Sequence, residues 1–507
     1  MRFGRLLLLS LLLLAAIVCF ADAYAQRPQK PSRQIRKMVK YLRTLERHYV
    51  EDIDLTPYIE GSIGEITSQL DPFSRYMTAE QYEQFQSRFT RRVAGIGAEF
   101  VVARDSVVVL RVMADSPAQI AGLMALDRIV AIDSHSVVGS DSEAVIAAIQ
   151  GEPSSLVTLS VVRPSDGSVQ ELSLHRAVIP QRSIPVYYKV SDDVAYVKLS
   201  SFTYDTSRSF EAILQTLGDV QTLIVDLCDN SGGLVAPAID VAGCFLKKNS
   251  VVCGLRNNGR SRQYRSSGNI FDGRVVLMVN EMTASASEVV AAALQDWDRA
   301  VVVGRATFGK GVGQHTFSYE DGSALQLTTM QVVAPSGRMI QRPFNLGATG
   351  DFYADFFSRM NEGAISEIDT AALPEFLTLR SSRRVYGNSG IQPDVVVARH
   401  REPRYDASYN SLVVAMLDKY RQVILSAYPL CSDFITTFAF DDSDLRLFAE
   451  SGNAVDVELL KMRMAFNIYP AEQYYPLYNE HFNDIYREAL SVAFSPIKAD
   501  EILSGGN

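Results

Sequence analysis

The sequence predicts a multi-domain α+β protein, because its hydrophobic pattern changes several times along 507 residues. Apolar residues recur at helical spacing within 26–90, and short β-rich runs fill 91–180. Apolar strands alternate with helices in 181–400, and helical spacing returns in 401–507. A chain of this length normally folds as several domains. We therefore expect a helical segment, a β-rich domain, an α/β core and a helical C-terminal domain.

The N-terminus has the layout of a secretory signal peptide. Two arginines precede an apolar run from Leu6 to Phe20, and small residues follow up to Ala25. The run is shorter than the ~20 residues of a spanning helix. We expect residues 1–25 to be a signal peptide that exports the chain, most simply to a periplasm. An uncleaved segment that associates with the membrane is the alternative.

Composition excludes several classes of function. A net charge of −9 argues against a nucleic-acid partner. The six histidines show no metal-binding spacing such as HExxH, so we expect neither a metal nor another cofactor. The cysteines after the leader are too few for a disulfide framework, although one bridge remains open. They are Cys228, Cys244, Cys253 and Cys431.

Hydrophobic periodicity places the elements of the two middle domains. In the first, alternating or β-branched runs predict strands, and one amphipathic run predicts a helix at 142–150. In the second, continuous apolar strands between helices predict a sheet covered on both faces. The strands are expected at 100–102, 107–112, 128–132 and 156–162, then at 194–199, 222–227, 275–279 and 300–303. The helices of the second domain are expected at 207–217 and 287–295.

Two strand-to-turn junctions carry candidate chemistry. Residues 229–233, Asp-Asn-Ser-Gly-Gly, follow an apolar strand, and paired glycines let the backbone turn its N–H groups toward a ligand. Ser285 precedes the second predicted helix, whose first turn offers free N–H groups and positive potential. Each junction also has a simpler interpretation. The first is also typical of a plain turn, and Ser285 with Glu288 forms a capping-box pattern.

Lys310 is a candidate partner for Ser285. It lies between Gly309 and Gly311 beyond a predicted buried strand, where it can pack against the sheet. A serine hydroxyl needs an adjacent base, and lysine serves as that base only when desolvation lowers its pKa. Ser–Lys pairs are an established variant of the serine triad.

Six motifs together resemble the carboxyl-terminal processing peptidases, also called tail-specific proteases, over about residues 35–398. In chain order they are LDPFSRY (70–76), GIGAEF (95–100), LIVDLCDNSGG (223–233), VNEMTASASEVVAAALQD (279–296), GRATFGKGVGQ (304–314) and YGNSGIQPD (386–394). The resemblance implies a crotonase-like α/β peptidase core without cofactors.

The resemblance also implies a role for each site residue. Ser285 falls on the nucleophile, Lys310 on the general base and Gln314 on the residue that orients the lysine. The oxyanion donors fall on the backbone N–H groups of Gly232 and Ala286. The neighbouring Ser287 matches a second serine of the family. We interpret it as a structural residue without a catalytic role.

Residues 95–177 resemble a PDZ domain, which binds an extended peptide as an added strand. Gly95, Ile96, Gly97 and Ala98 correspond to the loop that holds the peptide's terminal carboxylate on backbone N–H groups. The expected partners are therefore proteins or peptides with accessible C-terminal tails. The sequence departs from the common pattern at Leu126, where a glycine usually precedes Asp127. It departs in the core at Cys228 and Ser231, where arginine and proline are usual.

Four other interpretations remain to be weighed. Residues 304–310 fit a nucleotide-binding P-loop, but position 311 is glycine, so the hydroxyl that would hold Mg²⁺ is missing. A Ser–His pair through His315 is disfavoured, because adjacent strand residues point to opposite faces. A catalytically inactive PDZ-type scaffold is the alternative function. A homodimer is compatible with the sequence.

Overall fold

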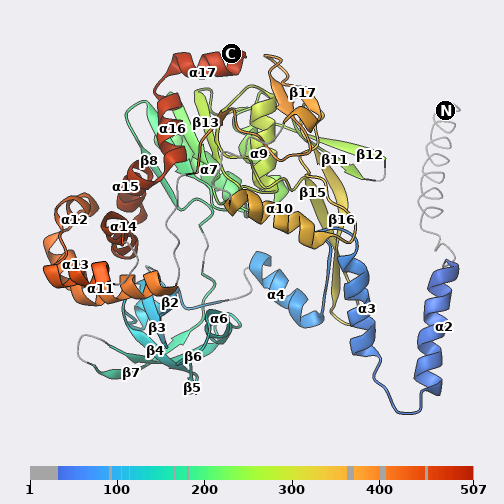
Figure 1. Ribbon diagram of the computed structural model, residues 1–507, viewed down its shortest axis with the longest axis horizontal. Coiled ribbons are helices and arrows are strands. Elements are labelled where there is room, and N and C mark those ends of the chain that lie inside the picture. Colours follow the sequence, from blue (N-terminus) through green and yellow to red (C-terminus); the bar gives the residue numbers. More distant parts are fainter. Residues whose placement is uncertain are drawn as a thin grey trace, which may run out of the picture. The chain divides into compact units, whose positions relative to one another are not determined.

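A computed structural model describes residues 32–90, 94–103, 105–113, 115–163, 167–179, 182–257, 259–361, 370–399, 407–450 and 455–505 (Figure 1). The chain divides into two compact units after Ile66. The first contains α2 (Arg33–His48) and most of α3 (Thr56–Ser68). None of the helices in these ranges is long and apolar enough to cross a membrane. The predicted signal peptide, 1–25, lies outside the described residues.

A small antiparallel sheet follows, in the strand order β2-β3-β4-β6-β7, with β5 paired to β4. Along β6 every second residue is buried, as expected for a strand with one face on a core. The strands and helices are β2 (Ala98–Ala103), β3 (Ser106–Val112), α5 (Pro117–Ile120), β4 (Arg128–Ile132), β5 (His135–Ser136), α6 (Ser142–Ile149), β6 (Leu156–Val162) and β7 (Val169–His175). The four strands predicted in this region are found, and β5 and β7 are additions.

The largest core surrounds a six-stranded sheet in the order β19-β14-β13-β10-β9-β8, parallel except for β8. Its central strand β10 is buried at all five positions, as the continuous apolar run predicts. The strands are β8 (Val186–Lys189), β9 (Val194–Lys198), β10 (Thr222–Asp226), β13 (Arg274–Val279), β14 (Val301–Gly304) and β19 (Val395–Val396). Both faces are therefore covered.

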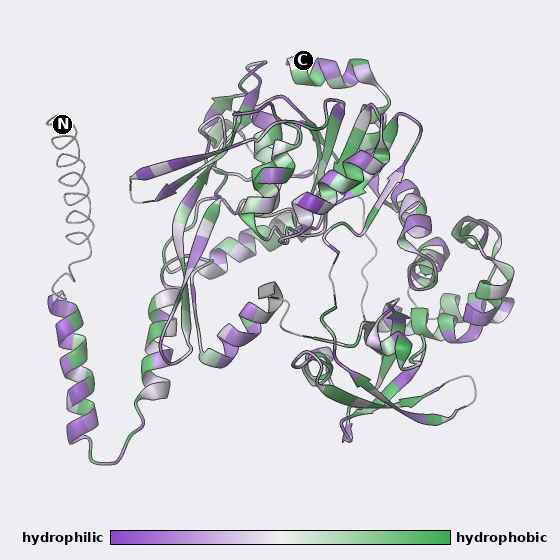
Figure 2. Cartoon of the chain, turned by 180° about the vertical axis from the view of Figure 1, so that it is seen from behind, coloured by the Kyte–Doolittle hydropathy of each residue, from purple (hydrophilic) through white to green (hydrophobic). Residues whose placement is uncertain are grey.

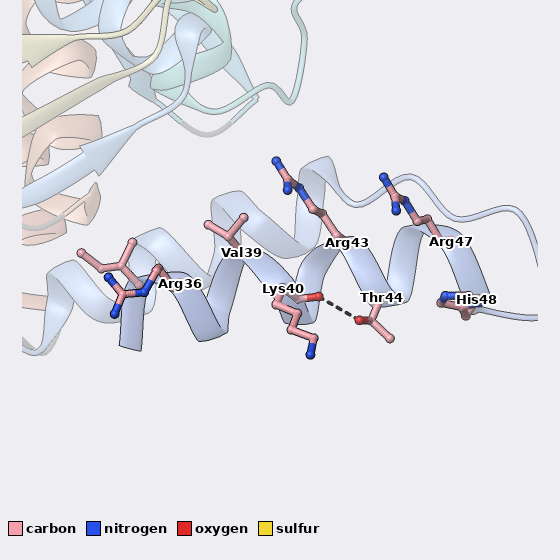
Figure 3. Close-up of a pocket in the computed structure, with 8 residues that line it drawn as sticks. Arg36, Val39, Lys40, Arg43, Thr44, Arg47 and His48 are labelled. Atoms are coloured by element: carbon pink, nitrogen blue, oxygen red, sulfur yellow. Dashed lines mark hydrogen bonds between the residues drawn. The ribbon is translucent and has the colours of Figure 1, made fainter. Parts of the chain in front are cut away.

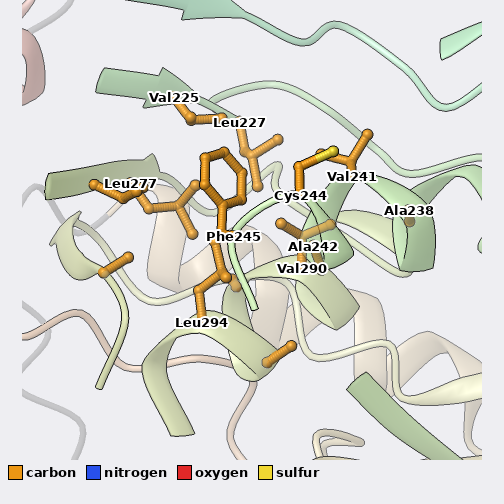
Figure 4. Close-up of a cluster of buried hydrophobic side chains, with 14 of the residues drawn as sticks. Val225, Leu227, Ala238, Val241, Ala242, Cys244, Phe245, Leu277, Val290 and Leu294 are labelled. Atoms are coloured by element: carbon orange, nitrogen blue, oxygen red, sulfur yellow. The ribbon is translucent and has the colours of Figure 1, made fainter. Parts of the chain in front are cut away.

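Different helices cover the two faces. Leu223 and Val225 of β10 pack with α7 (Thr206–Leu217), α8 (Val235–Gly243) and α9 (Ala286–Asp296). Figure 4 shows this cluster around Phe245. Ile224, between them, points to the other face and packs with α16 (Asp484–Ala493) and α17 (Pro496–Ser504). The C-terminal helices thus complete the core domain.

A second sheet, which the hydrophobic pattern does not predict, has the order β1-β16-β11-β12, with β15 also paired to β16. Its strands are β1 (Arg75–Met77), β11 (Val251–Asn257), β12 (Arg260–Arg265), β15 (Val312–Ser318) and β16 (Ala324–Val333). The pairs β1–β16 and β11–β16 join segments that are distant in sequence, whereas β15–β16 is a hairpin. Further elements are α4 (Ala79–Thr90), α10 (Thr349–Asn361), η1 (Thr370–Ala372), β17 (Glu375–Leu377) and β18 (Arg384–Tyr386).

The C-terminal region is helical, as predicted, and part of it packs on the small β sheet (Figure 1). Its remaining helices are α11 (Ala407–Ala427), α12 (Cys431–Thr437), α13 (Asp442–Glu450), α14 (Val457–Ile468) and α15 (Ala471–Phe482). Arg128 of β4 forms an ion pair with Asp418 of α11 at 2.5 Å. Leu126 adopts a φ of 74°, and its side chain is buried in the same cluster as these helices. This packing compensates for backbone strain at a position where glycine is usual.

Candidate active site

Parallel neighbours β10 and β13 carry the two predicted junctions at one edge of the core sheet. Carboxyl ends of parallel strands meet at the same edge, so the turn at 229–233 lies beside the turn before α9. Ser285 ends that second turn with a φ of 57°, a left-handed backbone that costs an L-residue on the order of 1 kcal/mol. The strained strand-to-helix turn keeps Ser285 partly exposed while Ala286 and Ser287 are buried.

Glu288 is the buried centre of this arrangement. One carboxylate oxygen accepts hydrogen bonds from the amide of Ser285 at 2.9 Å and from the amide of Lys310 at 2.8 Å. The two amide nitrogens therefore lie no more than 5.7 Å apart, the sum of the two distances. The other oxygen accepts from the Thr307 hydroxyl and from the Gly309 amide, at 2.5 and 2.7 Å. Burial raises the pKa of Glu288, and these donors oppose the rise.

Lys310 lies in a loop between β14 and β15 that only glycines allow. A Cβ on Gly311 would lie 2.4 Å from the amide nitrogen of Gln341, and Gly309 has a φ of 88°. The Lys310 ammonium lies 5.1 Å from the centre of the Phe73 ring. Burial lowers the pKa of Lys310; the Glu288 charge opposes this effect, whereas the Arg75 charge adds to it. These surroundings thus shift Lys310 toward the neutral amine that a base requires.

The segment 70–76 reaches the same site through β1. The Asp71 carboxylate accepts from the amides of Phe73 and Ser74 at 2.9 Å and from the Thr328 hydroxyl at 2.9 Å. Gln314 in turn donates to the Thr328 hydroxyl at 3.3 Å. In the sequence, this segment stands out only through the family resemblance, and Glu288 only through the capping-box pattern. The signal for Glu288 was an acid amid apolar residues of the predicted helix.

Gly232 packs directly against the Ser285 turn. A Cβ on Gly232 would lie 2.7 Å from the Ala284 carbonyl and 2.9 Å from the Ala286 amide, so the turn requires glycine. The Gly232 amide donates to the Asn230 side chain at 2.9 Å. The Ala286 amide, the first of α9, has no acceptor among the residues described. One predicted oxyanion donor is thus available in this conformation, and the other is held by Asn230.

The predicted nucleophile and base are connected through their main-chain amides, which both donate to the Glu288 carboxylate. Within the described ranges, no hydrogen bond directly links the Ser285 hydroxyl, the Lys310 amine and the Gln314 side chain. Catalytic hydrogen bonds are often long before substrate binds.

The other two candidates, Ser287 and His315, have different surroundings. Ser287 donates to the Asn230 carbonyl at 2.9 Å, and His315 is exposed, with its ring 4.7 Å from that of Phe317.

Two further expectations are decided by the fold. Lys310 is followed by strand β15 instead of the helix that a P-loop requires. The cysteines named above are buried free thiols, so no disulfide joins them.

The predicted carboxylate loop precedes β2, which is the end strand of its sheet. The Gly95 amide is already engaged with the Ala177 carbonyl at 3.0 Å. The amides of Ile96 and Gly97 have no acceptor in the described part of the chain. Gly97 has a φ of 77°, and a Cβ there would lie 2.3 Å from that of Ser116. Ala98 begins β2 and pairs with Val112. In this loop, the amides of Ile96 and Gly97 are therefore available to a carboxylate, and the Gly95 amide is not.

The fold and the site together define a serine peptidase with a PDZ domain. The model of peptidase family S41 matches residues 193–353, and the PDZ domain model matches residues 94–175. A probable CtpA-like serine protease of Staphylococcus epidermidis is 30% identical over 344 residues, 66% of this chain and 69% of the relative. A Staphylococcus haemolyticus protein of the same description is 31% identical over 319 residues, 61% and 64% of the two chains. The chain therefore belongs to peptidase family S41.

The solved structure of a photosystem II D1 C-terminal processing protease is also similar. It is 24% identical and aligns with a TM-score of 0.40, covering 72% of this chain and 88% of that one.

Proposed function

We propose that this peptidase holds the C-terminal tail of a protein on its PDZ domain and cleaves it with Ser285 as nucleophile and Lys310 as base. The observation that carries the proposal is the buried Glu288 carboxylate, which binds the amides of both residues. The lowered pKa of Lys310 is independent support, because only a neutral amine can accept the serine proton.

Each step has a residue to perform it. Lys310 takes the hydroxyl proton as the Ser285 oxygen attacks the scissile carbonyl carbon. The Ala286 amide donates to the resulting oxyanion, and the Gly232 amide joins it after leaving Asn230. The protonated Lys310 then gives its proton to the departing amine, which leaves an acyl-enzyme. Water, deprotonated by Lys310, attacks the ester and releases the second product.

Gln314 is the proposed positioning residue for the lysine side. Its amide bonds Thr328, which is itself held by Asp71 from the segment that carries Phe73. Gln314 is thus connected, through Thr328 and Asp71, to the segment whose Phe73 ring lies 5.1 Å from the Lys310 amine. This arrangement would keep the amine directed at the serine when a substrate displaces solvent.

The PDZ domain would supply substrate selection. A peptide added to the free edge of β2 would direct its carboxylate to the amides of Ile96 and Gly97. We further propose export through the signal peptide 1–25 to a periplasm, with a membrane-held form where that segment is retained. A homodimer is a further proposal, and sedimentation measurements would test it.

The test compares one unfolded substrate protein carrying a free or an amidated C-terminus. We expect wild-type enzyme to cleave the free form faster, and Ser285→Ala and Lys310→Ala to abolish cleavage of both. His315→Ala is the matched control, since His315 is exposed, and should retain activity. Full activity of Ser285→Ala would refute the nucleophile. Equal cleavage of both tails would refute tail capture, and an inert wild-type enzyme that binds tails would favour the scaffold alternative.

A further inference from the structure

Helix α2 has two chemically opposite faces. Its six Lys and Arg side chains outnumber its single acid, Glu46, whereas the whole chain has a net charge of −9. At 3.6 residues per turn, the cations fall on one half of the helix and the apolar residues on the other. The cations are Arg33, Arg36, Lys37, Lys40, Arg43 and Arg47; the apolar residues are Ile35, Met38, Val39, Tyr41, Leu42 and Leu45.

The apolar half is exposed. Ile35 and Tyr41 are 56% and 57% exposed, and Met38 and Val39 are 43% and 44% exposed. No residue of α2 is buried. Figure 2 shows hydrophobic and hydrophilic residues alternating along this helix, and Figure 3 shows Lys40, Arg43 and Arg47 extending from it. A contiguous apolar face of this kind normally has a partner.

The charge pattern indicates which partner. Lys37 borders the apolar half on one side, and Arg36 and Arg43 border it on the other. If two copies paired through this half, their bordering cations would face one another, and like charges oppose such pairing. An anionic bilayer suits both halves, because acyl chains take the apolar residues and headgroups take the cations. The one acid of the helix, Glu46, projects on the apolar half but lies in the last turn. The acids that follow, Glu51 and Asp52, lie beyond the end of the helix.

We propose that α2 is an interfacial helix that binds the chain to the surface of an anionic membrane. The helix lies in the plane of the membrane surface, because it is too short and too charged to span the bilayer. This binding acts through residues 33–48, so it differs from anchoring by the apolar run before Ala25 and persists if that run is removed. It is independent of the peptidase mechanism.

The test measures co-sedimentation of the exported chain, its N-terminus established by mass spectrometry, with lipid vesicles. One set of vesicles contains phosphatidylglycerol and phosphatidylcholine, and the other contains phosphatidylcholine alone. We expect the wild-type chain to prefer the anionic vesicles, with the preference falling as salt rises. Each cation near such a surface strengthens binding about fivefold. The double variant Lys37→Gln/Lys40→Gln should therefore bind about 25-fold more weakly, with helix propensity preserved.

Two further variants make the result decisive. Lys247→Gln/Lys248→Gln removes the same charge from exposed residues elsewhere and should bind like wild type. Ile35→Gln/Met38→Gln should weaken binding to anionic vesicles at least about tenfold through lost apolar burial. Peptidase activity in solution should stay unchanged in all variants, which shows that they fold. Should the enzyme prove inactive, circular dichroism replaces that control and the vesicle result stands.

Three outcomes would overturn the proposal. The first is equal vesicle binding by wild type and Lys37→Gln/Lys40→Gln. The second is an equal loss in the control Lys247→Gln/Lys248→Gln, which would mean that net charge alone is sensed. The third is self-association, seen by sedimentation velocity, that Ile35→Gln/Met38→Gln abolishes while vesicle binding is unaffected. That result would assign the apolar face to a second copy of the chain.

Discussion

Replacing Glu288 by glutamine tests the link between the nucleophile turn and the lysine loop. Each carboxylate oxygen of Glu288 accepts two hydrogen bonds, so an amide NH₂ in either orientation faces two of the four donors. Hydrogen bonds to charged groups contribute about 1.5–3 kcal/mol each. The smaller desolvation of a neutral amide offsets part of the loss. We expect the free energy of unfolding to fall by about 3 kcal/mol.

The same substitution should change catalysis in a way that simple destabilisation does not. A shift of about 1 Å between Ser285 and Lys310 is enough to lower kcat/KM about 100-fold. The Glu288 charge raises the pKa of Lys310, so its removal lowers that pKa further. Activity rises with pH as Lys310 loses its proton. The acidic limb of the kcat/KM profile should therefore move to lower pH in Glu288→Gln.

The assay is a fluorogenic peptide cleaved across a pH series, together with urea unfolding. Glu281→Gln is the matched control, because Glu281 is a nearby buried acid that pairs with Arg305 at 2.8 Å. It should lose stability without moving the acidic limb. If Glu288→Gln keeps both wild-type activity and the wild-type pH profile, Glu288 does not connect the two residues.

Two other predictions follow from the structure. Arg75→Gln should move the acidic limb of the kcat/KM profile to higher pH, opposite to Glu288→Gln, because the Arg75 charge lowers the pKa of Lys310; an unchanged limb would contradict this electrostatic account. Leu126→Ala should reduce the free energy of unfolding by about 3 kcal/mol through lost burial. Leu126→Gly should cost about 1 kcal/mol less, because glycine relieves the strain at a φ of 74°. Urea unfolding measures both, and a larger loss for glycine than for alanine would mean that the backbone there is not strained.

Local sequence determined much of the peptidase core. Strands such as β10 and β13 were predictable because continuous apolar runs have no stable place except inside a covered sheet. The Ser285 turn was predictable because small residues and a helix start follow a buried strand. The apolar periodicity of 401–507 likewise predicted helices. However, no local pattern indicated which surfaces those helices cover.

Tertiary structure decided what surrounds Lys310. The second sheet joins β1 to β16 across some 250 residues of chain, as in the pairing of Arg75 with Gln326, and periodicity does not encode such a partner. That pairing carries Phe73 to the lysine. Burial likewise added to the helix-capping role of Glu288 and made its carboxylate the shared acceptor for the amides of Ser285 and Lys310, because a carboxylate removed from water must collect its hydrogen bonds from the protein. The sequence by itself determined which residues are present at the site, and only the folded chain determined how they are connected.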